Sequence, residues 1–127
     1  AMGIKPIAKI LAFADAEHEP EWFTTAPTKA VPKALQLAGI SKNEVDFFEV
    51  NEAFSVVPLA FGKELDIDPE KMNIHGGAVS LGHPLGCSGA RIATTLIHIL
   101  HQKNGNIGAV GICNGGGGAS ALVLQRV

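Results

Sequence analysis

The sequence predicts one α/β domain in which helices cover both faces of a mostly parallel, five-stranded sheet. Apolar stretches with the composition of strands alternate along the chain with longer stretches of helical periodicity, in the order β-α-β-α-β-α-β-β. A length of 127 residues fits a single domain. Only a short glycine run separates the last two apolar stretches, so the last strand should run antiparallel to its neighbour and make the sheet mixed.

The first half of the chain opens with a strand at residues 7–14, IAKILAFA. Residues 27–39 have the spacing of an amphipathic helix, and Gly39 suits its end because glycine adopts the left-handed conformation there. Residues 47–50, FFEV, are apolar on both sides of the alternation apart from Glu49. A strand that is apolar on both faces is typical of the centre of a sheet.

The middle of the chain carries two helix-start signals. Ser41 and Glu44 fit a capping box over a short turn. Asn51 follows the FFEV strand and has the side chain of a good N-cap for a helix over residues 52–65. Pro58 predicts a bend in that helix.

The second half is predicted to hold the remaining strands and the most apolar helix. Residues 71–74, KMNI, form a short strand before a pair of glycines. Residues 85–103 form a long helix that is apolar nearly all round, which indicates burial on all sides. Residues 106–113 and 119–127 are the last two strands.

The composition indicates a covered surface and excludes several classes of function. Charged residues make up 17% of the chain, against about 25% in ordinary soluble domains, so a partner should cover part of the surface. A net charge of −2 gives no basic footprint for nucleic acid, and no apolar run reaches the roughly 18 residues of a membrane span. Two cysteines, Cys87 and Cys113, indicate a reducing compartment. Residues 1–3 resemble a cloning remnant, which leaves residues 4–127 as the domain.

Three unusual segments follow predicted strand ends and should therefore meet at one edge of the sheet. They are Asn51, the loop of residues 76–86 and Cys113. Four glycines, residues 115–118, follow Cys113 after one asparagine, and their backbone N–H groups could stabilise an oxyanion. His83 stands between a glycine and a proline, which hold its imidazole in place. A thiol beside such donors, with a histidine in reach, indicates thiol-based acyl transfer.

Simpler interpretations of the same residues stay open at this point. Cys113 could be a buried structural thiol, Asn51 only a helix cap and His83 only a structural histidine. The glycine-rich loop lacks both the dinucleotide and the P-loop patterns, which disfavours a nucleotide site. His75, His83, Cys87 and Cys113 lack the spacing of a zinc knuckle, which disfavours a metal.

Three motifs in order give the sequence a family resemblance. NEAF at 51–54, GGAVSLGHPLG at 76–86 and CNGGGG at 113–118 together resemble the C-terminal half of a thiolase, closest to its biosynthetic acetyl-CoA acetyltransferase branch. The resemblance implies a thiolase-like three-layer α/β/α half. It also implies Claisen condensation of two acetyl-CoA to acetoacetyl-CoA, the reverse thiolysis, CoA thioesters as substrates and no tightly bound cofactor.

The resemblance assigns a role to each matching residue. His83 corresponds to the histidine that activates the nucleophilic cysteine and helps bind the thioester oxygen, and Asn51 to the asparagine that holds a water of that oxyanion hole. Cys113 corresponds to the second, acid/base cysteine, whose thiolate form would need neighbouring donors to lower its pKa. Gly115 corresponds to the N–H donor of a second oxyanion hole, which the glycines would let approach where any Cβ intrudes.

Further expectations from the resemblance concern pocket, ion and partners. Phe54 would line the acyl pocket, and the carbonyl of Val79 matches one that binds potassium in some members. The nucleophilic cysteine lies in the N-terminal half of thiolases, so this chain should be inactive alone and should act in a homodimer or homotetramer. The compartment would be the cytoplasm, with the mitochondrion as the alternative. A 3-ketoacyl-CoA thiolase of fatty-acid oxidation and a non-catalytic binding module with the same fold stay open.

Overall fold

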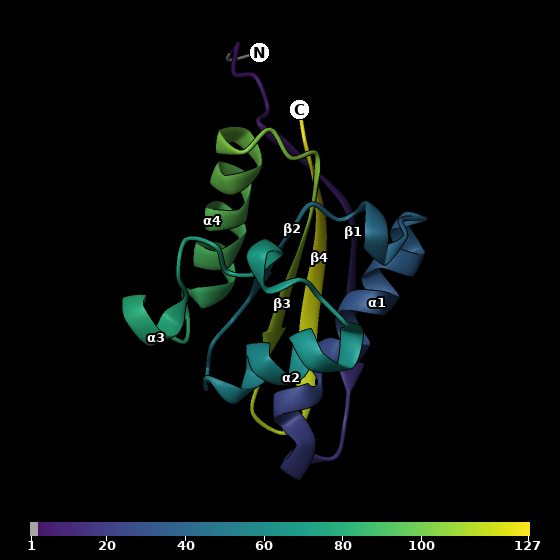
Figure 1. Cartoon of the computed structure of the whole chain (residues 1–127), viewed down its shortest axis with the longest axis vertical. Helices are drawn as coiled ribbons and strands as arrows, with labels where there is room; N and C mark the ends of the chain where they lie inside the picture. Colours follow the sequence, from purple (N-terminus) through teal and green to yellow (C-terminus); the bar gives the residue numbers. More distant parts are fainter. Residues whose placement is uncertain (1–2) are drawn as a thin grey trace.

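The computed structural model describes residues 3–127. Strands, helices and their bounds are β1 Ala8–Glu17, α1 Pro27–Ala38, β2 Phe47–Val50, α2 Val56–Leu65, α3 Ala78–Leu81, α4 Ser88–Gln102, β3 Ile107–Cys113 and β4 Gly118–Arg126 (Figure 1). Short 3-10 helices lie at Pro20–Thr25, Lys42–Glu44 and Pro69–Lys71. Residues 1–3 were predicted to be a cloning remnant. Residues 1 and 2 lie outside the described residues, so this stays a prediction.

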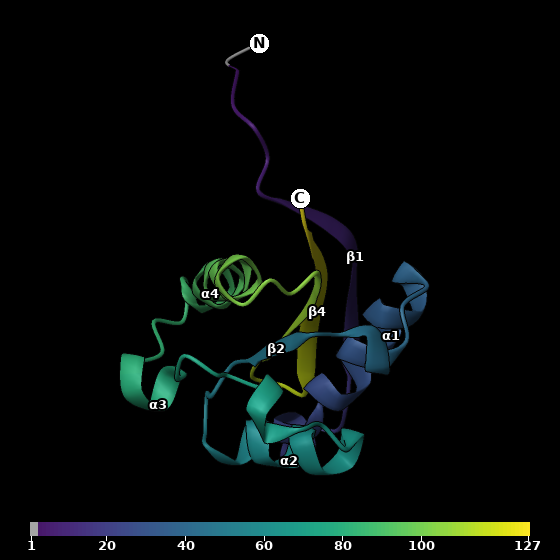
Figure 2. The same cartoon turned by 45° about the horizontal axis from the view of Figure 1, so that its top comes forward.

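The elements form three layers, as predicted. Helix α1 packs on β1, β3 and β4 at one face of the sheet, with α2 beside it. Helix α4 packs on β2 and β3 at the other face, and Figure 2 shows it on the side of the sheet opposite to α1 and α2. Helices therefore cover both faces, as the alternation of strands and helices predicted. Among residues 3–127 no helix has the length and apolarity to cross a membrane.

The sheet is mixed and has four strands in the order β1-β4-β3-β2. Strands β2 and β3 are parallel, with Phe47 opposite Gly108. Strand β4 runs antiparallel to both β3 and β1, which confirms the antiparallel last strand. The prediction of a mostly parallel sheet was wrong, because β1 pairs with β4 at the far edge rather than with β2.

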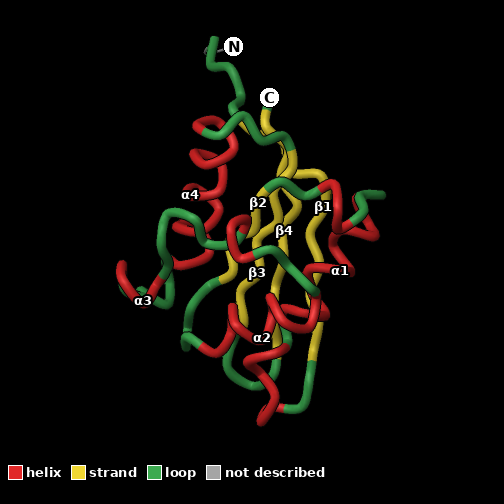
Figure 3. The backbone as a smooth tube through the Cα atoms, in the orientation of Figure 1, coloured by secondary structure: helices red, strands yellow, loops and turns green. Residues whose placement is uncertain are grey.

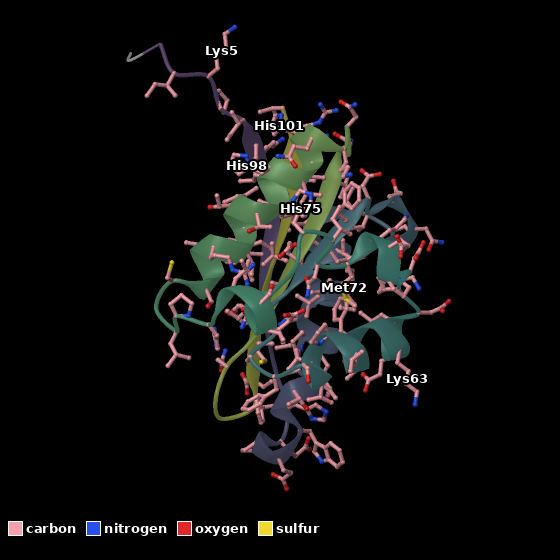
Figure 4. All side chains as sticks on the ribbon, turned by 60° about the vertical axis from the view of Figure 1, so that its left-hand side comes forward. Lys5, Lys63, Met72, His75, His98 and His101 are labelled. Carbon is pink, nitrogen blue, oxygen red and sulfur yellow. The ribbon has the colours of Figure 1, made fainter. Side chains whose placement is uncertain are left out.

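The fifth predicted strand, residues 71–74, is absent from the described residues. Met72 makes a single parallel bridge to Phe48, and the N–H of Asn73 donates to the Phe48 carbonyl at 2.9 Å. Asn73 has φ 51°, a left-handed conformation that ends any extended run. Its side-chain Oδ1 accepts from the N–H of Val50 and its Nδ2 donates to the carbonyl of Val50. The segment, in which Figure 4 labels Met72, therefore covers the outer edge of β2. Among the four strands, which Figure 3 draws in yellow, β2 is an edge strand, not the predicted central one.

Asn51 does not cap the helix that follows it. Helix α2 begins at Val56, and its N-cap is Ser55, whose side chain makes no capping hydrogen bond. Residues 52–55 form a turn instead. Pro58 lies in the first turn of α2, where its missing N–H has no helical partner to lose, so it gives no reason for a bend. The side chain of Asn51 is consequently available for another contact.

Strand β3 lies between a helix on each face, and two glycines make this possible. A Cβ on Gly108 would lie 2.7 Å from Cδ2 of Leu96 in α4. A Cβ on Gly111 would lie 2.9 Å from Cγ2 of Val31 in α1. Both contacts are closer than real Cβ atoms allow, so any side chain at either position would push a helix away from the strand. Close packing on both faces thus depends on these glycines.

Helix α4 is not buried on all sides in this chain. Its side toward the sheet is fully covered at Ile92, Leu96 and Ile99, whereas Ala90 and His98 are exposed. Beside it, the sheet face carries an open cavity of about 290 Å3 whose wall includes Phe13, 71% exposed. The predicted complete burial of the helix was therefore wrong for the described chain, which leaves an apolar face uncovered.

Glu49 is a fully buried carboxylate on β2. Its Oε2 lies 3.6 Å from Nη1 of Arg91 on α4, and neither carboxylate oxygen has a hydrogen-bond partner within residues 3–127. Burial raises the pKa of Glu49 to about 7, because the loss of solvent outweighs the attraction of Arg91. The folded protein therefore binds a proton at Glu49 more tightly than the unfolded chain does.

This pKa predicts a pH dependence of stability. The contribution of Glu49 to the free energy of unfolding is fully present below about pH 4.5 and is lost as the pH rises to about 7. We expect Glu49→Gln to remove this pH dependence and to be more stable than the wild type at pH 8, by on the order of 3 kcal/mol. Urea unfolding at pH 5 and pH 8 measures it, with Glu64→Gln on the exposed side of α2 as control. Equal pH dependence in wild type and Glu49→Gln would show that the buried carboxylate does not titrate in this range.

Candidate active site

Asn51 is held at the end of β2 with its side chain fully buried. Its N–H donates to the carbonyl of Gly111 at 2.9 Å, which continues the β2–β3 pairing by one residue. Its Nδ2 lies 3.4 Å from Nδ1 of His83, 32 residues away in sequence. The first and second motifs therefore meet, and the amide of Asn51 faces the histidine instead of a helix end.

His83 lies in the loop between α3 and α4 and is partly buried. Gly82 before it has φ 92°, a backbone conformation that favours glycine, and Pro84 follows it. Nδ1 of His83 lies 2.6 Å from Oγ of Ser88, a fully buried side chain in the first residue of α4. The sequence interpretation missed Ser88. Its position five residues after His83, where the loop enters the helix, was the only signal.

Predicted residues from the three motifs line one cavity of about 570 Å3. Its walls are Phe23, Ala53, Phe54, His83, Leu85, Ile112, Cys113, Asn114 and Gly115. The ring of Phe54 packs edge-on against Phe23 at 5.8 Å between centroids, so an aromatic pair forms part of the wall. The fold thus brings a histidine, a thiol, a glycine and an apolar surface to the same cleft.

Cys113 is the last residue of β3, and its side chain is 5% exposed. Burial raises the pKa of the thiol above its usual range, and the backbone hydrogen bond that lowers it is the weaker effect. Within the described residues, the condition that neighbouring donors lower this pKa is therefore not met, and Cys113 is a neutral thiol at neutral pH.

The glycines after Cys113 are needed for different reasons. Gly116 and Gly117 have φ of 90° and 96°, which side chains rarely adopt. A Cβ on Gly117 would also collide with the carbonyl oxygen of His18, whose N–H donates to the Gly117 carbonyl at 2.8 Å. Gly115 differs, because a Cβ there meets no described atom within 4 Å. The expectation that a Cβ at Gly115 would intrude concerns the reacting oxygen of a substrate, so it stays a prediction.

Glu52 fastens the loop that carries His83 to the end of β2. Its Oε2 accepts the N–H of Val79 at 2.8 Å, and its Oε1 accepts from Nδ2 of Asn73 at 3.3 Å. A Cβ on Gly77 would collide with this carboxylate, so the glycine pair before α3 makes room for it. The sequence predicted only that Glu52 is the first residue of a helix over residues 52–65. Val79 itself is 71% exposed and does not line the cleft.

A metal centre built from histidine, cysteine or acidic side chains has no support in the described residues. Within residues 3–127 no group of three histidine, cysteine or acidic side chains is placed to hold an ion. Cys87 is exposed and does not line the cleft. His98 and His101 lie near the end of α4 (Figure 4), and Nε2 of His101 lies 2.8 Å from the carbonyl of Ile7.

Comparison with known proteins matches residues 4–126 to the family model described as thiolase, C-terminal domain. A cytosolic acetyl-CoA acetyltransferase of Gibberella zeae is 56% identical over 99% of this chain and 32% of its own length. Acetyl-CoA acetyltransferase 2 of Arabidopsis thaliana is 60% identical over 98% of this chain and 31% of its own length. The crystal structure of the Acat5 thiolase of Ascaris suum in complex with coenzyme A superposes with a TM-score of 0.92 and 52% identity, over 98% of this chain and 32% of that one. The chain thus spans about a third of the length of its relatives.

The glycine loop generates a stability prediction. We expect Gly117→Ala to destabilise the fold by about 3 kcal/mol or more, because it combines an unfavourable φ with a collision against backbone. Gly115→Ala is the matched control and should change stability by less than about 0.5 kcal/mol. Urea unfolding of the two variants measures the difference. Similar stability of both would show that the loop can relax around Gly117.

Proposed function

The chain belongs to the thiolase family as its C-terminal domain, and on that premise we propose that it supplies half of the active site of an acetyl-CoA C-acetyltransferase. The enzyme would join two acetyl-CoA into acetoacetyl-CoA and catalyse the reverse thiolysis. The observation that carries the proposal is the convergence of His83, Cys113 and Gly115 on one cleft, with Asn51 against the imidazole. The names of the relatives from Gibberella and Arabidopsis support the acetyl substrate.

In the first half-reaction His83 would take the proton of a nucleophilic cysteine that lies outside this chain. The cysteine sulfur attacks the acetyl carbonyl, and CoA leaves as a thiolate. The neutral thiol of Cys113 then gives its proton to that thiolate, which releases CoA and leaves the thiolate of Cys113 behind. Because burial raises the pKa of Cys113, this thiolate is a stronger base than an exposed one.

In the second half-reaction the Cys113 thiolate would remove a proton from the methyl group of a second acetyl-CoA. The negative charge moves to the thioester oxygen, where His83 and a water held by Asn51 stabilise it. The carbanion attacks the acetyl-cysteine, and the N–H of Gly115 contributes to stabilising the charge on that carbonyl oxygen. This attack forms the new C–C bond. Collapse of the tetrahedral intermediate then breaks the C–S bond, and the cysteine leaves as a thiolate that takes back the proton held by His83.

The remaining two thirds of the enzyme would cover the apolar face that this chain leaves open. The uncovered side of α4 and the exposed ring of Phe13 lie on that face. Covering it would exclude water from a reaction that must remove a very weakly acidic proton. We therefore propose that the chain is inactive without this part. We also propose that the complete enzyme is a homodimer or homotetramer. The cytosolic relative supports a cytoplasmic enzyme, with a mitochondrial one as the alternative.

The test is thiolysis of acetoacetyl-CoA by CoA in the complete enzyme, with this chain joined to its N-terminal part. We expect Cys113→Ala and His83→Ala each to lower kcat by about 100- to 10,000-fold, because each removes a proton-transfer group. Cys87→Ala is the matched control, since that thiol is exposed and outside the cleft. Full turnover in Cys113→Ala would refute the proton-transfer role of Cys113, whereas the membership of the thiolase family would still hold.

A series of 3-ketoacyl-CoA substrates in the same assay separates the remaining candidates. A preference for long acyl chains would replace the acetyl assignment with a thiolase of fatty-acid oxidation. A complete enzyme without turnover on any chain length, in which the Cys113 thiol is also unreactive toward alkylating reagents, would favour a non-catalytic binding module.

A potassium ion at the carbonyl of Val79 is part of the proposal on resemblance alone. Val79 is exposed on the one-turn helix α3, and the neighbouring carboxylate of Glu52 is engaged with the Val79 N–H and Asn73. Only the carbonyl is therefore assigned to the ion. We expect turnover of the complete enzyme to fall when sodium replaces potassium at equal ionic strength. Equal rates in the two salts would remove the ion from the proposal.

A further inference from the structure

We propose that Ser88 is a positioning residue for His83, whose hydroxyl keeps Nδ1 paired in each protonation state and directs the chemistry to Nε2. The inference rests on the proposed function for its consequence, and on the hydrogen bonds around Nδ1 for its geometry. Ser88 is the only fully buried serine among the described residues, and its Oγ lies 2.6 Å from Nδ1.

The position of Ser88 in α4 does not explain its hydroxyl. The N-cap of α4 is Cys87, and no side chain makes a capping bond at this helix start. A buried hydroxyl without a structural partner costs free energy, so the 2.6 Å contact is its principal use. The second possible partner is the carbonyl of Pro84, 3.1 Å from Oγ.

The hydrogen bonds of Ser88 assign the tautomer of His83 in the resting enzyme. The hydroxyl of Ser88 donates to the Pro84 carbonyl at 3.1 Å, a bond from a helical serine to the carbonyl four residues earlier. With its hydrogen directed there, the Ser88 oxygen, 2.6 Å from Nδ1 of His83, acts as an acceptor. This arrangement favours the neutral tautomer with hydrogen on Nδ1, which leaves Nε2 free to take the proton of the nucleophilic cysteine. Nε2 then carries that proton and can stabilise the thioester oxygen.

The same hydroxyl serves the protonated state. When His83 holds a proton on both nitrogens, Nδ1 remains a donor and still needs an acceptor. The Ser88 oxygen stays that acceptor, because its own hydrogen remains on the Pro84 carbonyl and no heavy atom moves. A side chain without an acceptor at this place would leave the Nδ1 hydrogen buried and unpaired in both states. Ser88 would therefore let one imidazole work both as base and as oxyanion donor.

Ser88→Ala in the complete enzyme tests the proposal. We expect kcat of thiolysis to fall about 10- to 100-fold, as for other groups that orient a functional histidine, with KM for both substrates within about twofold. Thr95→Val is the matched control. The partly buried hydroxyl of Thr95 also donates to the carbonyl four residues earlier in α4, that of Arg91, at 3.0 Å, but it has no hydrogen bond to an imidazole. A kcat of Ser88→Ala equal to that of Thr95→Val would overturn the proposal.

A second pair of variants separates the effect of the Ser88 hydroxyl from the effect of side-chain volume at this position. Ser88→Thr and Ser88→Val add the same bulk at a fully buried position and differ only in the hydroxyl. We expect the threonine variant to be at least about tenfold more active than the valine variant. Equal activity of the two folded variants would show that packing alone matters.

A measurement without turnover keeps this inference separate from the proposed function. Nitrogen NMR of histidine-labelled complete enzyme reports which imidazole nitrogen carries the hydrogen. We expect the resting signal of His83 to show hydrogen on Nδ1 in the wild type, and a shift toward hydrogen on Nε2 in Ser88→Ala. An unchanged tautomer would overturn the role of Ser88 even in an active thiolase. The expected change in a protein without thiolase activity would refute only the proposed function.

Discussion

Close packing of a helix on each face of β3 is the constraint on which the rest of the structure depends. Gly108 lets Leu96 of α4 approach one face, and Gly111 lets Val31 of α1 approach the other. The strand is thereby fixed between two layers, and its last residue, Cys113, is fixed with it. Sites built on rigid elements hold their geometry better than sites built on loops, so the two glycines help to position a thiol that they do not touch.

The site grows outward from this strand by backbone pairing and one carboxylate. Strand β2 lies parallel to β3, and the N–H of Asn51 extends the pairing to the carbonyl of Gly111. Glu52, the next residue, then binds the N–H of Val79 and holds the loop that leads to His83. One short edge strand therefore positions both the asparagine and the histidine loop relative to the thiol.

Burial gives the site its chemistry and costs the fold stability. It raises the pKa of the Cys113 thiol, and it places the hydroxyl of Ser88 against one imidazole nitrogen. The same contact between β2 and α4 encloses Glu49 and Arg91, whose polar atoms have few partners within residues 3–127. Proteins accept such local costs where polar groups serve a function.

The sequence by itself determined the strands at 47–50 and 106–113, the stop at Gly39 and the segments that carry the site, because periodicity, turn residues and motifs are local properties. The tertiary structure alone decided that Asn51 faces His83 instead of capping a helix, since its partner is 32 residues away. It also decided the edge position of β2, the partner of Ser88 and the raised pKa of Cys113. Strand order, hydrogen-bond partners and burial depend on contacts between distant segments, which no local pattern encodes.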